Sequence, residues 1–312
     1  MSKRLHLAAL PLLLGLSASV LAQAPETVNI GYQKANIFAL LKYRGTLDET
    51  FKKQGIAVRW VEFPAGPQML EGLNVGSIDL AATGDAPPAF AQAAQADLVY
   101  LAHSPANPKT EAIVVPENSP IHNVADLKGK RVGLNKGSDV NYLLVAALEK
   151  AGLSYKDITP VYLPPADARA AFQREAIDAW VIWDPYLAEV ETNAKARQIR
   201  NAEGLVPHYT FYLASRKFAE NHPDTAKQVV DELRQLSDWA NAHQDDAAGI
   251  LSTSTGLDKA IWLKALARLP YGAERMTPAV YNEQQALADT FTRIGLLPVK
   301  VDVRSATWSQ DK

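Results

Sequence analysis

The sequence predicts an α/β protein made of two doubly wound lobes that are joined by a hinge of two strands. Three observations point to this fold class. The chain of 312 residues is too long for one ordinary core and long enough for two. Short apolar runs with strand character alternate with segments of helical periodicity, which is the order typical of parallel sheets. This alternation starts again beyond a proline-rich connector at 104–109, where we expect the second lobe.

The first residues have the composition of an export leader rather than of a folded segment. A basic start precedes an apolar run at 7–16 that is too short to span a bilayer, and a small-residue cleavage signature ends at Ala22. Cleavage after Ala24 also fits such a signature, but Pro25 in the next position favours Ala22. We therefore predict a signal peptide over 1–22. Because the chain has no cysteine for a lipid anchor or a disulfide, we expect a soluble periplasmic protein.

The first lobe is predicted to span 23–112 and 213–312. Its amino-terminal part alternates between strands and helices, because runs rich in β-branched and aromatic residues are followed by apolar residues at three-to-four spacing. Glycine and proline separate these elements, for example Gly55 after a helix. The predicted strands are 27–31, 56–63, 77–82 and 98–102, and the predicted helices are 37–42, 46–54, 68–74 and 87–94.

The second lobe is predicted to span 113–212 and repeats the same alternation. Its strands are expected at 110–115, 131–134, 158–163 and 179–183, with helices at 140–150, 166–174 and from Pro185 onward. A strand expected at 211–215 is similar in composition to the one at 110–115, and we interpret the two as the crossings between the lobes. Three amphipathic helices are then expected to pack on the first lobe, at 224–243, 257–269 and 278–294.

Two strand-to-helix turns form the predicted ligand site. In the first, a buried strand ends at Thr83-Gly84, Asp85 can cap the next helix, and Pro87-Pro88 fit a first helical turn because proline lacks an amide hydrogen. The second turn, 135–139, has the same character. Such turns present unpaired N–H groups and the positive end of a helix dipole, which hold anions without a charged side chain. We expect the two turns to face each other across a cleft.

Each residue of these turns also has an ordinary structural interpretation. Asp85 and Ser138 can be plain helix caps, and Gly84 and Gly137 can be plain turn glycines rather than points of close approach to a ligand. Gln33 can be a solvated loop amide. Its position at the carboxyl end of the first strand nevertheless favours a binding role, since ligands of open α/β sheets bind at that edge.

Trp183 and Asp184 end a strand of the second lobe. Trp180 is expected in the core, whereas Trp183 lies at the strand's end, where its indole could wall a pocket. Asp184 precedes Pro185 and could cap the next helix, hold a neighbouring donor in place, or meet a cationic part of a ligand.

Several function classes have no support in the sequence. The formal charge of −2 and the pI near 6.3 give no reason to expect nucleic acid or an anionic membrane as partner. No phosphate-binding P-loop and no GxGxxG occur. The six histidines are scattered without the spacing that metals need, and no nucleophile stands beside a base. We therefore expect no cofactor, no metal and no catalysis.

Three segments carry a resemblance to a known family. The run WVEFPAGPQMLEGLNVGSIDLAATGDAPP (60–88), the run 165–172 and the motif WDPY (183–186) closely resemble the aliphatic-sulfonate-binding proteins of bacterial ABC importers. The likeness extends over about 28–308 and implies the type II periplasmic-binding-protein fold, in which two lobes close on a ligand. It also implies a sulfonate pocket lined by Gln33, Thr83, Gly84, Asp85, Gly137, Ser138, Trp183 and Asp184, with Tyr209 or Thr210 as a further candidate.

One residue departs from that family pattern. Members often carry small hydroxyl residues after the glycine that matches Gly137, whereas here Ser138 is followed by Asp139. A carboxylate facing a sulfonate would repel it. Either Asp139 turns away as an acid of the first helical turn, which the helix dipole favours, or the ligand also bears an amine or ammonium group.

The predicted function is capture without chemistry. A monomeric periplasmic receptor would bind an organosulfonate and deliver it to the membrane permease of an ABC importer for sulfur acquisition. Within the same class, the alternative ligands are taurine, nitrate or another small oxyanion. From other classes, the alternatives are an enzyme on the same fold and a sensor lobe of a membrane receptor.

Overall fold

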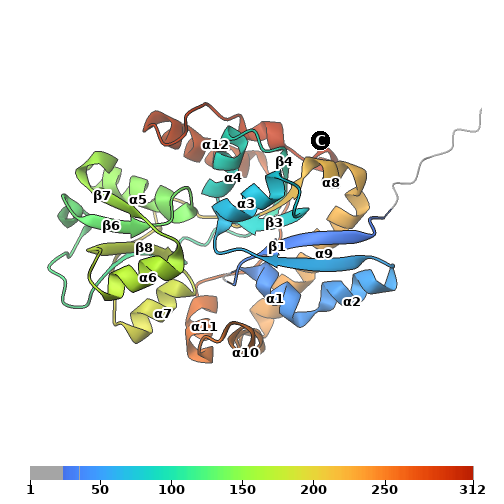
Figure 1. Ribbon diagram of the computed structural model, residues 1–312, viewed down its shortest axis with the longest axis horizontal. Coiled ribbons are helices and arrows are strands. Elements are labelled where there is room, and N and C mark those ends of the chain that lie inside the picture. The colour runs from blue at the N-terminus through green and yellow to red at the C-terminus, as the bar shows by residue number, and fades with distance from the viewer. Residues whose placement is uncertain (1–23, 35, 312) are drawn as a thin grey trace, which may run out of the picture.

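The computed structural model of the chain describes residues 24–34 and 36–311 and shows two α/β lobes, each built on its own five-stranded sheet (Figure 1). The predicted two-lobed fold class is thereby confirmed. The predicted signal peptide, 1–22, lies outside the described residues. Across residues 24–34 and 36–311, no helix is both long enough and apolar enough to cross a membrane.

The sheet of the first lobe has the strand order β2-β1-β3-β10-β4. Strand β1 pairs in parallel with β2 and β3, whereas β10 pairs antiparallel with β3 and β4. The alternation of strands and helices predicted parallel sheets, so the antiparallel β10 is a correction; this strand returns from the second lobe and enters the sheet from the opposite side. The five strands are β1 (Thr27–Tyr32), β2 (Ala57–Glu62), β3 (Leu80–Thr83), β4 (Leu98–His103) and β10 (Phe211–Ser215).

The sheet of the second lobe has the order β7-β6-β8-β5-β9 and the same mixed character. Strand β5 pairs antiparallel with β8 and β9, while β6 pairs in parallel with β7 and β8. Strand β9 was not predicted, because its sequence RQIRN lacks an apolar alternation and it lies half-buried at the edge. The strands are β5 (Glu111–Val115), β6 (Arg131–Leu134), β7 (Thr159–Tyr162), β8 (Ala179–Trp183) and β9 (Arg197–Asn201).

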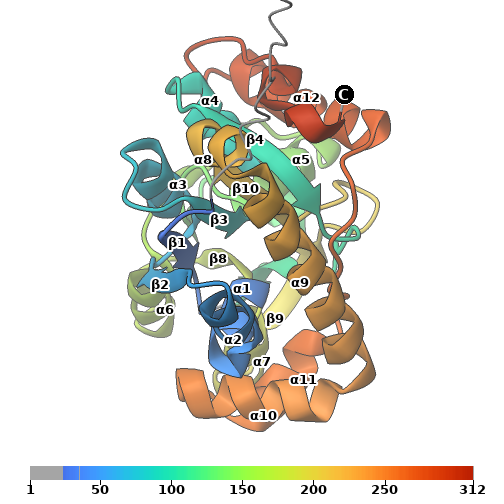
Figure 2. The ribbon, with the colours of Figure 1, turned by 90° about the vertical axis from the view of Figure 1, so that its right-hand side faces the viewer.

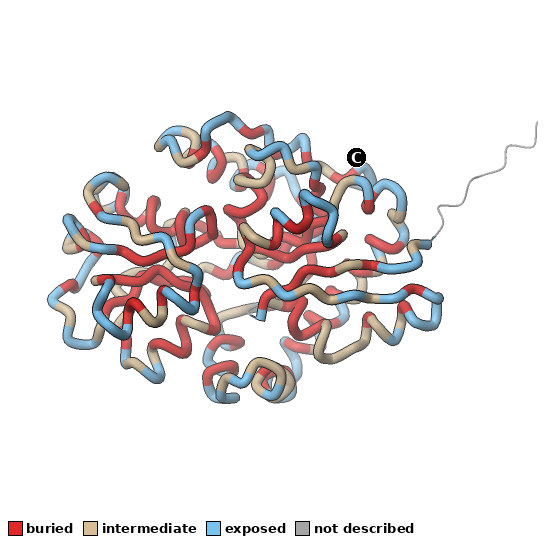
Figure 3. The backbone as a smooth tube through the Cα atoms, viewed as in Figure 1, coloured by how far each residue is buried: buried red, intermediate tan, exposed pale blue. Residues whose placement is uncertain are grey.

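Helices cover both faces of the first sheet, and the residues of β10 show how. Tyr212 and Ala214 belong to the core shared with α1, α2 and α9–α11, whereas Phe211 and Leu213 belong to the core shared with α3, α4 and α12. Figures 1 and 2 show these two groups of helices on opposite sides of the sheet. Trp308 in the carboxyl-terminal tail is buried in the first of these cores. Buried residues fill the centre of both lobes, and exposed ones lie mainly on the outer helix faces (Figure 3).

The helices agree with the predicted segments except at two places. Helices α8 and α10 were not predicted: α8 is short, and α10, with the sequence QDDAAGILSTST, is rich in small and polar residues. The helices of the first lobe are α1 (Ile37–Arg44), α2 (Thr46–Lys53), α3 (Gly66–Asn74), α4 (Ala86–Ala93), α8 (Arg216–Asn221), α9 (Pro223–Ala242), α10 (Gln244–Thr255), α11 (Lys259–Leu266) and α12 (Pro278–Arg293). Those of the second lobe are α5 (Asp139–Lys150), α6 (Pro165–Gln173) and α7 (Tyr186–Asn193).

Two chain segments connect the lobes. Residues 104–110 lead from β4 to β5, and residues 202–210 lead back from β9 to β10. The two crossing segments are hydrogen bonded to each other, from the Asn107 amide to the His208 carbonyl (2.9 Å) and from the Ser104 amide to the Thr210 carbonyl (2.8 Å). The strands predicted as crossings, β5 and β10, lie in different sheets and do not pair with each other. Each is instead the strand that one crossing segment leads into.

Candidate functional site

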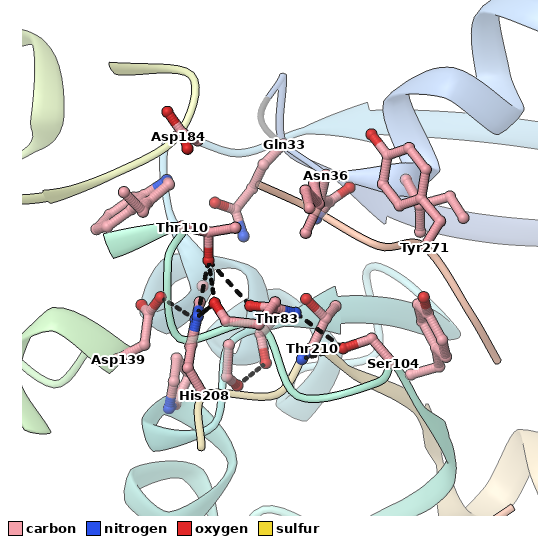
Figure 4. Close-up of a pocket in the computed structure, with 18 residues that line it drawn as sticks. Gln33, Asn36, Thr83, Ser104, Thr110, Asp139, Asp184, His208, Thr210 and Tyr271 are labelled. Atoms are coloured by element: carbon pink, nitrogen blue, oxygen red, sulfur yellow. Dashed lines mark hydrogen bonds and ion pairs between the residues drawn. The ribbon is translucent and has the colours of Figure 1, made fainter. Parts of the chain in front are cut away.

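A pocket of about 60 Å³ lies between the lobes, where the carboxyl ends of β1, β3 and β8 meet the crossing segments (Figure 4). The first lobe contributes Gln33, Asn36, Ile37, Gly66, Thr83, Gly84, Pro87, Tyr212, Leu269 and Tyr271. The crossing segments contribute Ser104, Asn107, Thr110, His208 and Thr210, and the second lobe contributes Asp139, Trp183 and Asp184. Of the predicted site residues, Gln33, Thr83, Gly84, Trp183, Asp184 and the alternative Thr210 are thus at one pocket.

The two predicted turns face each other, and Gly84 is the point of closest approach. A Cβ atom built on Gly84 would lie 2.7 Å from the Asp139 Cγ and 2.8 Å from its Cβ. Only a glycine lets the β3–α4 turn come this close to the start of α5. The Gly84 amide donates no hydrogen bond within the described part of the chain, so it is open to a ligand in the pocket.

The second turn contributes different residues from those predicted. The Gly137 amide donates to the Asn141 Oδ1 (3.1 Å), and the Ser138 hydroxyl donates to the Asn135 carbonyl (2.7 Å). Gly137 has a φ of 74° and faces Phe90 in a separate surface groove. Neither residue lines the pocket. The helix start at α5 reaches the pocket through Asp139 instead.

Asp85 and Tyr209 also lie away from the pocket surface. Asp85 makes no capping hydrogen bond to α4. Its buried carboxyl accepts from the backbone amide of Tyr209, and burial raises the pKa of Asp85 to about 7. The hydroxyl of Tyr209 donates to Glu283 on α12 (2.5 Å), outside the pocket. The neighbouring Thr210, the other predicted candidate, does line it.

Of the two alternatives that the sequence left open for Asp139, the first, an acid that turns away from the site, is wrong, and the second, a ligand that also bears an amine or ammonium group, stays a prediction. Asp139 does not turn away from the pocket, and its charge is matched by a histidine: the Asp139 Oδ2 lies 2.8 Å from the His208 Nε2 (Figure 4). The other ring nitrogen of His208, Nδ1, lies 3.0 Å from the Thr110 hydroxyl. His208 is thereby held in the crossing segment with both nitrogens engaged, and it neutralises the acid that the sequence singled out.

Two further carboxyls accompany this pair in a buried cluster of Asp85, Glu111, Asp139 and His208. Glu111 is fully buried, and neither of its carboxyl oxygens has a hydrogen-bond partner among the described residues. Burial raises the pKa of Glu111 to about 8, although the positive charge of His208 acts to lower it. Burial alone would lower the pKa of His208, but the carboxylates of Glu111, Asp139 and Asp85 together raise it to about 10. The cluster therefore retains protons that the same groups would lose in water.

The same cluster is the part of the described chain whose geometry could hold a metal ion. One ligand atom each of Glu111, Asp139 and His208 lies within 4.8 Å of the others. Sequence spacing gave no sign of this set, because the three residues come from β5, the start of α5 and a crossing segment. The direct hydrogen bond between His208 and Asp139 accounts for two of the three without a metal.

This cluster predicts that the protein loses stability as the pH rises. The folded-state pKa values of Asp85, Glu111 and His208 all lie above their ordinary values, so the folded chain binds more protons than the unfolded one. The contribution of these three groups to the free energy of unfolding is complete below pH ~4. It is lost progressively as the pH rises through their folded-state pKa values, the highest of which is ~10. Urea denaturation at pH 5, 7 and 9 should show a falling midpoint. A Glu111→Gln variant should show a shallower decline, and a midpoint that rises with pH would contradict this account.

Trp183 and Asp184 form the rim of the pocket on the second lobe. The Asp184 Oδ1 accepts from the Ala188 amide in the first turn of α7 (3.0 Å), as in the predicted capping role. Its Oδ2 has no hydrogen bond within the described residues and lies 3.8 Å from the Arg268 Nε. Burial raises the pKa of Asp184 to about 7 in spite of this arginine. Arg268 follows α11 of the first lobe and also pairs with Glu191 of α7, so an ionic contact joins the lobes here.

Tyr271 is a pocket residue that sequence reasoning missed. Its side chain is buried, and its hydroxyl has no partner among the described groups. The Asn241 side chain holds the Tyr271 backbone on both sides, accepting from the amide (3.1 Å) and donating to the carbonyl (2.9 Å). Burial raises the pKa of Tyr271, which keeps the hydroxyl a donor. Asn36, Ser104 and His208 were missed as well, since only the fold brings these loop residues together.

The comparisons with known proteins give a consistent result. A family model described as NMT1/THI5 like matches residues 49–247. A relative from Escherichia coli (strain K12), named among the aliphatic sulfonates-binding proteins, is 44% identical over 299 residues, which cover 94% of this chain and 93% of the relative. The solved alkanesulfonate-binding protein of Xanthomonas axonopodis pv. citri, bound to MOPS, is 43% identical with a TM-score of 0.88, covering 92% of this chain and 99% of that one. The periplasmic aliphatic sulphonate binding protein of Escherichia coli has a TM-score of 0.82 at 42% identity, covering 92% and 93%.

Proposed function

The chain belongs to the NMT1/THI5-like family and to the aliphatic sulfonate-binding proteins, and from this premise we propose that it captures a sulfonate in the pocket between its lobes. The relatives described above are binding proteins, and one of them is described as periplasmic. By the proposal, this chain likewise binds without catalysis. It acts as a monomer in the periplasm, after loss of the signal peptide, and delivers its ligand to the permease of an ABC importer for sulfur acquisition.

The observation that carries the proposal is the set of open hydrogen-bond donors around the pocket. Within the described chain, no partner engages the Gly84 amide, the side chains of Gln33 and Thr210, or the Tyr271 hydroxyl. A sulfonate spreads one negative charge over three oxygens and needs several such donors at once. Neutral donors suffice because hydrogen bonds to an anion strengthen where water is excluded.

The pocket size favours a small ligand. A cavity of about 60 Å³ has room for the equivalent of only a few water molecules, which is on the scale of a sulfonate head with a short chain. Trp183 and Leu269 supply apolar surface for that chain. A longer tail would require the lobes to stand further apart.

Ligand capture proceeds, in this proposal, by closure of the lobes about the two crossing segments. Gly84 and Asp139 come from different lobes and leave no room for a Cβ atom between them, as expected of a closed form. Ion pairs join the lobes at two further points, Arg268 with Glu191 and Arg293 with Glu149 (2.9 Å). The lobes move as units close to the predicted limits, 23–112 with 213–312 and 113–212. The permease recognises the closed form.

The ligand is tested by calorimetry with straight-chain alkanesulfonates. We expect saturable binding, and we expect the affinity to be weaker in Gln33→Ala and Tyr271→Phe. Removing one neutral hydrogen bond costs about 0.5–1.5 kcal/mol, so Tyr271→Phe should weaken binding roughly two- to tenfold. The same variant should leave thermal stability unchanged or slightly higher, because the hydroxyl has no partner in the free protein.

A matched control and a ligand panel complete this test. Tyr162→Phe removes the hydroxyl of an exposed side chain on β7 that does not line the pocket, and this variant should bind with unchanged affinity. Sulfate, nitrate and taurine in the same assay distinguish the sulfonate receptor from receptors for other small oxyanions. Absence of binding to every organosulfonate would defeat the proposal.

A further inference from the structure

Helix α11 of the first lobe packs against helix α7 of the second lobe, and we call this contact the α7–α11 seam (Figures 1 and 2). Ala188 of α7 is buried in the core of the first lobe, so the two lobes exclude water here. Both helices adjoin the pocket, because the pocket residue Asp184 comes just before α7 and the pocket residue Leu269 comes just after α11. Groups that join the lobes at this seam therefore lie close to the ligand site.

Arg268 crosses the α7–α11 seam. It follows α11, and its Nη2 donates to the Oε2 of Glu191 on α7. Its Nε lies 3.8 Å from the Asp184 Oδ2, which is buried and has no hydrogen bond among the described residues. Although burial acts to raise the pKa of Glu191, hydrogen bonds from Lys264 and Arg268 hold it below its ordinary value, so this acid is ionised at neutral pH. Two acids of the second lobe thus face a guanidinium that the first lobe supplies.

The two ion pairs that join the lobes differ in their exposure to water. The side chains of Arg268 and Glu191 are 14% and 13% exposed, whereas those of Arg293 and Glu149 are 58% and 41% exposed. An exposed pair contributes little, because water and salt screen it. Loss of one partner from a buried pair leaves the other charge uncompensated, which is costly. Of these two arginines, Arg268 is therefore the one on which closure depends.

Arg268 belongs to a segment that also forms a wall of the pocket. Leu269 and Tyr271 follow it in sequence, and both line the pocket. The segment is held on the first lobe, since the Tyr212 hydroxyl donates to the Gly272 carbonyl (2.8 Å). A ligand between the lobes therefore contacts the same segment that reaches across to the second lobe.

We propose that Arg268 is a positioning residue that latches the closed lobes around the ligand and so sets the rate of ligand release. This inference rests on the proposed function. Arg268 does not line the pocket and acts through Glu191 and Asp184. Because the latch joins residues of opposite lobes, it forms only on closure. Its loss shortens the lifetime of the closed complex and leaves the first encounter of the ligand with the open lobes unchanged.

Stopped-flow kinetics with propanesulfonate test the latch, and the fluorescence of Trp183 in the pocket lining reports binding. We expect Arg268→Gln to raise the release rate constant by about tenfold or more and to change the association rate constant by less than about twofold. Arg268→Lys keeps the charge and should recover part of the loss. Arg293→Gln breaks the exposed pair and is the matched control, so both of its rate constants should equal those of the wild type.

A double-mutant cycle separates the latch from a merely structural role of Arg268. Glu191→Gln removes the partner, so Arg268→Gln should raise the release rate much less in that background than in the wild type. An equal increase in both backgrounds overturns the latch, and so does a release rate near the wild-type value in Arg268→Gln; both results leave the sulfonate receptor standing. If the wild type binds neither propanesulfonate nor any other organosulfonate, the proposed function falls together with the inference.

Discussion

A Gly84→Ala substitution should weaken sulfonate binding by about fivefold or more. The new methyl group would lie 2.7 Å from the Asp139 Cγ and 2.8 Å from its Cβ, which is closer than non-bonded carbon atoms approach in folded proteins. Asp139 cannot swing aside freely, because its carboxylate is bound to His208 and its Cβ is fixed by α5. The lobes must therefore separate. Overpacking of this kind costs about 1–3 kcal/mol, which corresponds to a loss of affinity of roughly 5- to 150-fold.

The backbone conformation of Gly84 does not explain the expected loss of affinity, so the substitution tests the contact with Asp139 alone. Gly84 is not among the described residues with positive φ, so alanine can adopt its conformation. The ligand-free protein should accordingly unfold at nearly the wild-type denaturant concentration, because separation at the crossings relieves the clash. Gly249→Ala on α10, where the nearest atom is 4.0 Å away, is the matched control and should bind as the wild type does. Wild-type affinity in Gly84→Ala would show that binding needs no closure.

A His208→Gln substitution should lower the free energy of unfolding by about 3–5 kcal/mol at pH 7, the cost of leaving one partner of a buried ion pair uncompensated. His208 faces Asp139, Glu111 and Asp85, and its positive charge favours the ionised forms of Glu111 and Asp85, which burial disfavours. Glutamine fills a similar volume but cannot carry the charge. Urea denaturation measures the loss.

A second variant and a control show whether the loss of stability in His208→Gln comes from the missing charge or from poorer packing. Adding Asp139→Asn to His208→Gln removes the acid that the substitution leaves unpaired, so the double variant should recover part of the loss. His122→Gln replaces an exposed histidine and should change stability by less than ~0.5 kcal/mol. A loss below ~1 kcal/mol in His208→Gln would mean that the cluster does not depend on the imidazolium.

The fold was largely predictable because most of its elements have strong local signals. The strands at 131–134 and 179–183 were predicted with the bounds that β6 and β8 have, since each is a short apolar run between turn residues. Strand β9 and helix α10 lack such a pattern. Strand β9 is held by pairing with β5, and helix α10 is held by packing against α1 and α11. The direction of β5 and β10 also depends on tertiary structure, because a strand's sequence carries little information about its orientation in a sheet.

The site was predictable where it depends on strand ends and not where it depends on the crossings. Gln33, Thr83 and Trp183 end strands, and the carboxyl edge of an α/β sheet is a general place for ligands. Gly137 was predicted at the pocket because its turn has the right composition, yet its amide is taken by Asn141. His208 and Tyr271 lie in irregular segments, so no periodicity could have placed them beside the strand ends.

The most direct test of the central claim is a crystal structure of the protein with propanesulfonate. The account predicts the sulfonate between the lobes, with its oxygens within hydrogen-bond reach of the Gly84 amide and the side chains of Gln33 and Thr210, and the propyl chain toward Trp183. A sulfonate bound elsewhere, such as in the groove beside Phe90 and Gly137, with the interlobe pocket filled only by water, would contradict it.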